Sequence, residues 1–348
     1  RPNFVWFPTK VVGIFGLLLT CSTIAAAPHI PPSDDTVLER LPFKPTDAVA
    51  RELRELRAAT IAAPLDPTPA ARLARRYFRL AMAEGDPRYV GYGEAVLARW
   101  WTAADAPVEV LIARALLKQY KHDFESALAD FGAAGRQDPG REVIWSWRAA
   151  LHIVRAEYAE AAKDCEPLQS ISVASRAACQ AWIDGINGKA AMAYESMQAA
   201  FAQDADASPS ERIWTLTRLA ELALRLGEPQ RAERHFRAAL AAGEDDQYLL
   251  GAYADFLLDE GRPAEVLPML SKWRRSDVLL LRLAIAAKLI GSPDAKTYAD
   301  DMQARFAAAA LRGDKLHLQE EARFALEVRG DAAGALRVAI ENYTTQRE

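Results

Sequence analysis

The sequence predicts an all-α protein, built as an α-solenoid of antiparallel helix pairs. Ala is the dominant residue and β-branched residues are sparse, which favours helix because Ala loses no side-chain entropy on entering one. Amphipathic stretches of about 12–15 residues follow one another from Pro69 onward, separated by Gly, Pro or Asp clusters. The short turns recur, with 156 − 122 = 34 residues between His122 and Ala156 and 261 − 227 = 34 between Gly227 and Gly261. A fixed step of this length indicates a helical repeat.

Composition and charge narrow the class of protein. The chain has 348 residues, of which 51% are hydrophobic and 26% charged, the mixture of a folded protein and not of a disordered one. It carries 43 Lys and Arg against 47 Asp and Glu, a formal net charge of −4. Such a chain has no bulk attraction to phosphate backbones, so we expect no nucleic-acid partner.

The first segment, residues 1–27, has the pattern of a secretory signal peptide. Residues 11–27 contain no charge, Arg1 and Lys10 precede them, and the small residues Ala25-Ala26-Ala27 close the run. The alternative is an uncleaved membrane anchor, since 27 − 11 + 1 = 17 apolar residues approach the roughly 20 that span a bilayer. We expect an exported protein, periplasmic or secreted, that meets a membrane only through this segment if it stays uncleaved.

Residues 28–68 are predicted to be a Pro-rich linker that contains one helix, at about 47–62. Val49, Leu53, Leu56 and Thr60 recur on one face of that helix, while charged residues occupy the other. The helical repeat array is predicted to occupy 69–348. Its first turn is expected in the block 85–93, which is longer than the repeat needs.

Later turns between paired helices are expected at His122, Ala156, Gly188, Gly227, Gly261, Gly291 and Gly330. The step from Gly188 to Gly227 is 227 − 188 = 39, so an insertion at about 205–209 would allow the array to bend there. One helix pair cannot bury its apolar face alone, so successive pairs stack and share a continuous core. Small residues mark the places where helices approach closely, namely Ala115, Ala149, Ala181, Ala220 and Ala254 on first helices and Ala127, Ala161, Ala193 and Ala232 on second helices.

These positions resemble the tetratricopeptide repeat family. The family pattern is matched by Trp145 and Ala149 in one copy, by Leu216, Leu219, Ala220, Ala232, Phe236 and Ala239 in another, and by Leu250, Tyr253, Ala254 and Leu270 in a third. The resemblance covers residues 105–275 well and 70–348 loosely, and Ala replaces the family Gly in the first helix. It implies a right-handed superhelix whose first helices line a concave binding surface.

Projecting that concave face onto this chain gives a predicted partner-binding groove. Its residues are Glu109, Gln119, Tyr120, Ser146, Trp182, Trp214, Thr217, Glu221, Arg225, Tyr248 and Asp255. A surface that mixes aromatic and charged side chains is typical of peptide recognition. The alternative is that some of these residues are covered by the N-terminal helix or by a neighbouring repeat. Trp145 and Trp273 fall at packing positions instead.

The same repeat frame places Cys165 in a second helix and Cys179 near the start of the next first helix. An oxidising compartment would allow them to form a disulfide that closes a loop of about 15 residues. The alternative is a pair of small buried thiols.

No catalytic pattern stands out. The five histidines, at 29, 122, 152, 235 and 317, lack zinc-ligand spacing, and no phosphate-binding or nucleophile motif is present. Asp245-Asp246, Asp300-Asp301 and Glu320-Glu321 are interpreted as solvated helix ends and faces. An arginine stripe at 72, 75, 76 and 79 is interpreted as a solvated face with helix salt bridges, the alternative being an anion or acidic-peptide site. We expect neither a metal nor a cofactor, and no enzyme activity.

These observations favour a non-catalytic scaffold or adaptor in the cell envelope that binds a peptide or another protein on a concave helical surface. Two alternatives remain open. One is an α-helical toroid enzyme that acts on a glycan through paired carboxylates, for which export and the aromatic content are the motive. The other is an accessory subunit of an envelope complex, anchored in the membrane by residues 11–27.

Overall fold

The structure is a computed structural model that describes Ser33 and residues 47–203, 205–313 and 315–347. The predicted signal segment 1–27 and residues 28–32 and 34–46 of the predicted linker lie outside these described residues. The chain divides into two units, Arg1–Asp47 and Ala48–Glu348, and the account below concerns the second. In the part of the chain that the structure describes, no helix has both the length and the apolar character needed to cross a membrane.

The second unit contains helices and no strand among its described residues, which confirms the all-α class and the repeat of antiparallel pairs. It begins with α1 (Ala48–Ala62). The pairs that follow are α2 (Pro67–Glu84) with α3 (Arg88–Leu97), α4 (Val108–Tyr120) with α5 (Phe124–Gln137), α6 (Glu142–Val154) with α7 (Tyr158–Cys165), α8 (Val173–Ile186) with α9 (Ala190–Gln203), α10 (Pro209–Arg225) with α11 (Pro229–Leu240), α12 (Gln247–Asp259) with α13 (Pro263–Leu270), α14 (Asp277–Leu289) with α15 (Ala295–Arg312), and α16 (Leu318–Arg323) with α17 (Ala332–Tyr343). Short 3₁₀ turns extend α3, α7 and α13 at Ala98–Trp100, Glu166–Ser170 and Ser271–Trp273, and a π-helical stretch, Phe324–Arg329, extends α16.

Each first helix of a described pair ends at a residue with left-handed backbone geometry. These residues are Gly85, His122, Ala156, Gly188, Gly227, Gly261, Gly291 and Gly330, with φ between 58° and 82°. Positive φ is easy for Gly and costs energy for residues with a Cβ, so His122 and Ala156 are the exceptional members. The turns that set the repeat step in the sequence are therefore confirmed.

The small residues predicted at close approaches are buried. Ala127, Ala161 and Ala232 on second helices and Ala115, Ala220 and Ala254 on first helices are all 0% exposed. Larger side chains such as Phe131 and Phe236 fill the space between pairs and are 0% and 1% exposed. Trp145 and Trp273 pack against these cores as predicted.

One expectation is wrong near the N-terminus. Residues 85–93 were expected to form a long turn, yet Arg88 begins the helix α3, which packs against α2 as the second helix of the first pair. The turn is short because Gly85 adopts φ 64° directly at the end of α2. The glycines at 91 and 93 are helical, and Gly93 is small because a Cβ there would lie 2.8 Å from the Leu117 side chain of α4.

The helix predicted at about 47–62 is present as α1 and covers α2. Leu53 is buried between the two helices, while Arg57 donates a hydrogen bond to the Tyr77 hydroxyl at 2.7 Å. Arg76 forms an ion pair with Glu52 at 2.7 Å, and Arg75 forms one with Glu109 of α4 at 2.8 Å. These two members of the arginine stripe therefore form salt bridges, but with neighbouring helices and not within a solvated face of their own helix.

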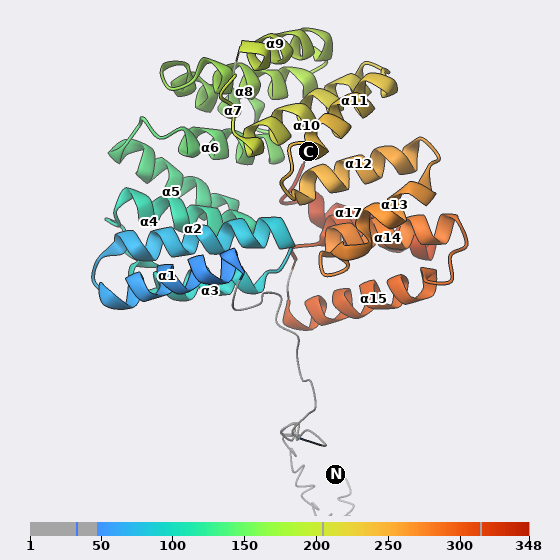
Figure 1. The fold of residues 1–348 in the computed structure, drawn as a ribbon, viewed down its shortest axis with the longest axis horizontal. Coiled ribbons are helices and arrows are strands. Elements are labelled where there is room, and N and C mark those ends of the chain that lie inside the picture. The colour runs from blue at the N-terminus through green and yellow to red at the C-terminus, as the bar shows by residue number, and fades with distance from the viewer. Residues whose placement is uncertain (1–32, 34–46, 204, 314, 348) are drawn as a thin grey trace, which may run out of the picture. The chain divides into compact units, whose positions relative to one another are not determined.

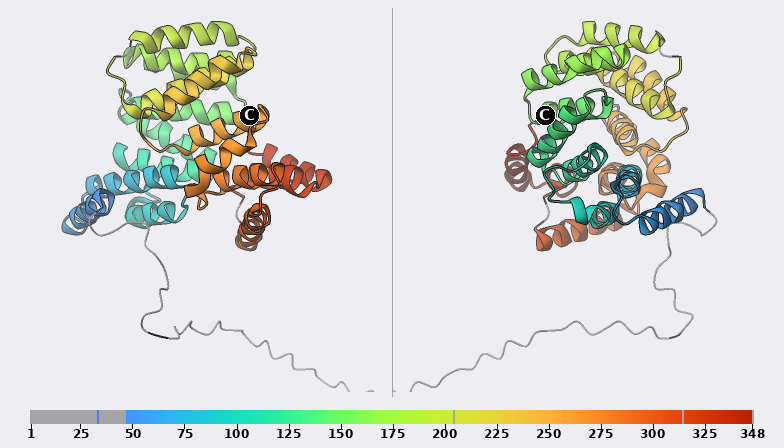
Figure 2. Two further views of the ribbon diagram at one scale, coloured as in Figure 1. Left: turned by 45° about the vertical axis from the view of Figure 1, so that its right-hand side comes forward. Right: turned by 90° about the vertical axis from the view of Figure 1, so that its left-hand side faces the viewer.

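The pairs follow a curve that brings α12 and α14 back beside α2 (Figure 1). Along the C-terminal part of this curve α8, α10, α12 and α14 form the inner row and α9, α11, α13 and α15 the outer row, and Figure 2 shows the same neighbours from two further sides. The Gln247 amide of α12 donates a hydrogen bond to the Met82 carbonyl of α2 at 3.0 Å, and Ser276 hydrogen-bonds Gln247. We call this group the closing contact. Gly85 lies against it, since a Cβ there would be 2.7 Å from the Gln247 side chain.

Cys165 at the end of α7 and Cys179 in α8 are joined by a disulfide, with their Cα atoms 5.8 Å apart. Both lie in a small buried cluster with Ile153, Leu168 and Ile183. The bond links the third helix pair to the fourth.

Candidate functional site

The predicted groove residues Glu109 and Ser146 belong to the second and third helix pairs. Glu109 at the start of α4 forms ion pairs with Arg75 of α2 at 2.8 Å and with Arg141 before α6 at 2.5 Å. Ser146 of α6 is half-buried. Glu109 therefore ties three neighbouring first helices together, and its carboxylate is already used within the fold.

Gln119 and Tyr120, at the end of α4, do not form an exposed surface. Gln119 is only 8% exposed, because it lies on the side of α4 that packs in the core, and the groove assignment of this residue is wrong. Tyr120 is half-buried, and burial raises its pKa to about 12, an effect strengthened by the carboxylates of Asp277 and Asp86. The influence of Asp277 shows that α14 comes close to Tyr120 across the curve.

Farther along the chain, three consecutive first helices bring aromatic and charged side chains together. We call Trp182, Trp214, Arg218, Glu221, Arg225 and Tyr248 the aromatic–arginine patch. Its centre is the Arg218 guanidinium of α10, which lies 4.2 Å from the ring centroid of Trp182 in α8 and 4.5 Å from that of Tyr248 in α12. A guanidinium stacked between two rings is attracted by both ring faces.

Glu221 holds the Arg218 guanidinium and the Tyr248 side chain in this arrangement. Its carboxylate accepts a hydrogen bond from Arg218 at 2.8 Å and another from the Tyr248 hydroxyl. The Arg218 and Glu221 side chains are 10% and 19% exposed, so the pair is partly shielded from water. Side chains held in this way lose little conformational freedom when a ligand binds, which favours affinity.

The rim of the patch is exposed. Tyr248 is 51% exposed and Trp214 is 37% exposed, and Trp214 meets Trp182 edge to face with ring centroids 6.3 Å apart. Arg225 is exposed at the end of α10, and a small cavity lies among Trp182, Arg218, Glu221 and Arg225. Large aromatic side chains next to fixed charges are the chemistry of peptide and protein recognition.

Thr217 and Asp255, two further predicted groove residues, are occupied within the fold. Thr217 is wrong as a surface residue, because it is 2% exposed and its hydroxyl donates to the Ile213 carbonyl of its own helix at 2.7 Å. Asp255 of α12 is half-buried and forms ion pairs with Arg282 of α14 at 2.6 Å and with Arg323 of α16 at 3.0 Å. The Asp255 carboxylate therefore links α12 to α14 and α16.

Arg218 is the functional residue that the sequence analysis missed. Both Thr217 and Arg218 lie near the stripe defined by Trp214 and Glu221, since positions three and four residues apart share a helix face. The short side chain of Thr217 remains in the core, whereas the long side chain of Arg218 carries its guanidinium to the rings of Trp182 and Tyr248. The longer side chain of Arg218 was the signal in the sequence that could have identified it as the groove residue.

The acidic pairs are mostly helix ends or surface residues, with one correction. Asp246 caps the N-terminus of α12, where its side chain accepts from the Leu249 amide at 2.7 Å. Glu320, interpreted as solvated, has a side chain only 14% exposed, and it lies 3.8 Å from His317, three residues before it in the sequence. In the described ranges, no three His, Cys, Asp or Glu side chains are grouped as a metal site would require.

No family model matches the sequence, and no curated protein matches it. Among solved structures, a tetratricopeptide repeat protein from Parabacteroides merdae aligns with 14% identity and a TM-score of 0.44, over 73% of this chain and 91% of that one. A chain of the APC/C hetero-tetramer Cut9-Hcn1 aligns with 13% identity and a TM-score of 0.48, over 84% of this chain and 52% of that one. Both TM-scores are below 0.5, so the fold assignment rests on the helix pairs themselves.

Proposed function

We propose that this chain is a protein-interaction scaffold that binds a peptide segment of a partner protein on the aromatic–arginine patch. The observation that carries the proposal is the exposure of Trp214 and Tyr248 around an Arg218–Glu221 pair that is already fixed by stacking and hydrogen bonds. Trp, Tyr and Arg are the residue types that dominate binding energy at protein interfaces.

The position of the patch favours an extended or helical segment as its ligand. The patch crosses α8, α10 and α12, so a bound segment would lie across consecutive first helices. Its central charges are paired, so specificity would come from stacking on Trp214 and Tyr248 and from the exposed Arg225 at the rim. An acidic residue of the segment would be the natural partner of Arg225.

We place this activity in the cell envelope. The signal-peptide pattern at 1–27 supports export, and a disulfide between Cys165 and Cys179 suits an oxidising compartment. Mass spectrometry of the protein purified from its native cells tests this directly. A mature N-terminus near residue 26 or 28 supports export with cleavage, whereas retention of residues 11–27 supports the membrane-anchored accessory subunit.

The binding proposal is tested by affinity capture with the full chain, followed by titration of the recovered partner. Trp214→Ala with Tyr248→Ala is expected to weaken binding at least about 30-fold, the effect of losing more than 2 kcal/mol at a hot spot. Tyr92→Ala with Leu311→Ala is the matched control, because these side chains are 49% and 91% exposed away from the patch. Equal binding by both double variants would reject the patch as the site.

A further inference from the structure

A second concave site lies between the outer helices α9 and α11, away from the aromatic–arginine patch. Both helices pack on α10, and the space between them is a cavity of about 540 Å³. It occurs at the step from Gly188 to Gly227, where the chain has an insertion before α10 (227 − 188 = 39).

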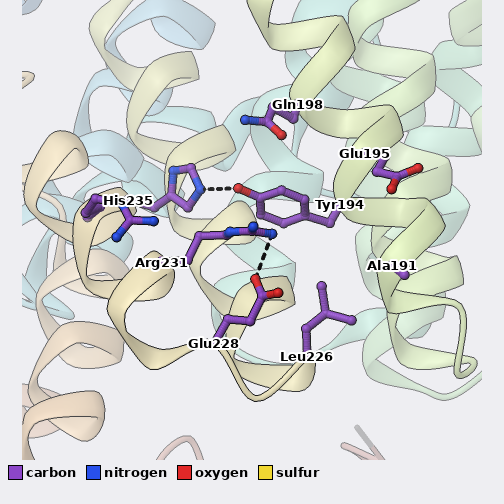
Figure 3. A pocket seen from close by; sticks show the side chains of 9 residues that line it. Ala191, Tyr194, Glu195, Gln198, Leu226, Glu228, Arg231 and His235 are labelled. Carbon is purple, nitrogen blue, oxygen red and sulfur yellow. Dashed lines mark hydrogen bonds and ion pairs between the residues drawn. The ribbon is translucent and has the colours of Figure 1, made fainter.

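A tyrosine and a histidine meet in this cavity from opposite sides (Figure 3). The Tyr194 hydroxyl of α9 is 2.7 Å from Nε2 of His235 in α11, and Tyr194 is 5% exposed. Burial, followed by the positive charges of Arg234 and Arg231, lowers the pKa of His235 below its ordinary value. Burial raises the pKa of Tyr194, so at neutral pH both groups are uncharged and joined by one hydrogen bond.

Two arginines of α11 supply positive charge to the same space. The Arg231 guanidinium lies 5.1 Å from the ring centroid of Tyr194 and forms an ion pair with Glu228 at 2.7 Å. Arg234 lines the cavity and is exposed. Glu195 of α9 lies on the side of Tyr194 away from His235 (Figure 3).

The balance of charge indicates the ligand class. The groups that line the cavity are Arg231 and Arg234 against Glu195 and Glu228, a formal sum of 2 − 2 = 0 with His235 neutral and +1 with His235 protonated. A single negative charge is matched by the protonated state, whereas a doubly charged phosphate is not. Ala191 and Leu226 add apolar surface beside these charges, which fits a carboxylate carried on a short aliphatic chain.

We propose that the α9–α11 cavity binds a carboxylate between Arg231, Arg234 and His235, and that binding is coupled to protonation of His235. A negative charge next to the imidazole favours its protonated form, and proton uptake in turn strengthens binding of the anion. The titratable and charged groups that face His235 are Tyr194 and Glu195 on α9, Glu228 just before α11, and Arg231 and Arg234 on α11, while the apolar Leu226 follows the end of α10.

The test is NMR titration of the histidine ring signals in the full chain, with propionate as the probe and His235→Gln for assignment. Saturating propionate is expected to raise the pKa of His235 by about one unit, which corresponds to about tenfold tighter binding below that pKa than above it. His235→Gln is expected to remove the pH dependence of binding, and Arg234→Gln to weaken propionate binding about tenfold.

Arg237→Gln is the matched control, because Arg237 belongs to the same helix but pairs with Glu233 at 2.7 Å, outside the cavity lining. A peptide with a central Glu, compared with its Gln counterpart, distinguishes a partner's side chain from a free acid as the source of the carboxylate. The proposal is overturned if neither probe shifts the His235 signals, if Arg234→Gln and Arg237→Gln bind equally, or if phosphate binds more tightly than propionate.

Discussion

The first helices of the N-terminal half and of the C-terminal half carry arginines that make different contacts. In α4 and α6 the arginines face their own partner helices, where Arg114 pairs with Asp130 and Arg148 with Asp164. These two pairs repeat with the array, since 148 − 114 = 34 and 164 − 130 = 34. In α10 the corresponding arginine, Arg218, is stacked on the inner face instead.

A shift of one residue explains the difference. Arg114 and Arg148 lie 122 − 114 = 8 and 156 − 148 = 8 residues before the left-handed turn residue, whereas Arg218 lies 227 − 218 = 9 before its own. One residue rotates a side chain by about 100° around the helix axis. Arg282 follows the second pattern, at 291 − 282 = 9, and reaches Asp255 of the neighbouring first helix. Register within the first helix thus decides whether an arginine closes a pair or faces the inner curve.

Arg114→Met gives the largest expected effect on stability. The Arg114 side chain is 6% exposed, and it also donates to the backbone carbonyls of Trp100, Trp101 and Ala103. Removing it leaves the Asp130 carboxylate buried with Lys118 alone, so unfolding in urea should show a loss of about 3–5 kcal/mol. Arg218→Met, the matched change in the other half, should lose less stability, because the Glu221 carboxylate is more exposed than that of Asp130 and still accepts from Tyr248, but should weaken partner binding. Equal losses of stability would contradict the proposed contrast.

The stability of the junction between the N-terminal and C-terminal halves should depend on the Cys165–Cys179 disulfide. Cys165→Ala with Cys179→Ala opens a loop with a sequence separation of 14 residues, and we expect a loss of up to about 3 kcal/mol. The measurement is thermal and urea unfolding of the double variant beside the native chain with and without reductant. If reductant lowers the stability of the double variant as much as that of the native chain, the effect does not come from this bond.

Lowering the pH should reduce the stability of the N-terminal half through protonation of His122. Burial, with the positive charge of His317 as a smaller cause, lowers the pKa of His122 from 6.5 to about 4, while Glu320 opposes the shift. The unfolded chain therefore binds a proton before the folded chain does, so this stability is complete above pH 6.5 and is lost as pH falls toward 4. Between pH 7 and pH 5 the native chain should lose about 1–2 kcal/mol more than His122→Gln. Parallel pH profiles would show that His122 is not responsible.

The smallest effect is expected at a turn, and it should be favourable. Ala156 has φ 58°, while the matching turn of α10 has a glycine at 227 with φ 73°. Ala156→Gly relieves the left-handed strain at some cost in chain entropy, so we expect a gain of about 0.5–1 kcal/mol. Gly227→Ala is the reciprocal change and should destabilise by a similar amount. A loss of stability in Ala156→Gly would mean that its methyl group contributes more to packing than the turn costs.

The fold could be predicted because its signals are local. The turn residues, the buried alanines and the step of 34 residues all reflect contacts between helices close in sequence, such as Ala127 and Ala161 at 0% exposure. The block 85–93 was misjudged because its glycines resemble a turn, although Gly93 is helical and only allows close approach of Leu117.

The candidate site was only partly predictable. Trp182, Trp214, Glu221, Arg225 and Tyr248 do lie together, because a helix stripe is a local property. The surroundings of Tyr120 depend on how far the array curves, which brings Asp277 of α14 near α4. Curvature accumulates small rotations over many pairs, so no single stretch of sequence encodes it.

The closing contact has a consequence for how the protein unfolds. In an array where each pair touches only its neighbours, the end pairs can open independently of the rest. Here the hydrogen bond from Gln247 to Met82 joins residues 165 positions apart, so opening the first pair also breaks a contact of α12. Amide hydrogens in α2 and α12 should therefore exchange with solvent at similar free energies of opening, as parts of a single cooperative unit.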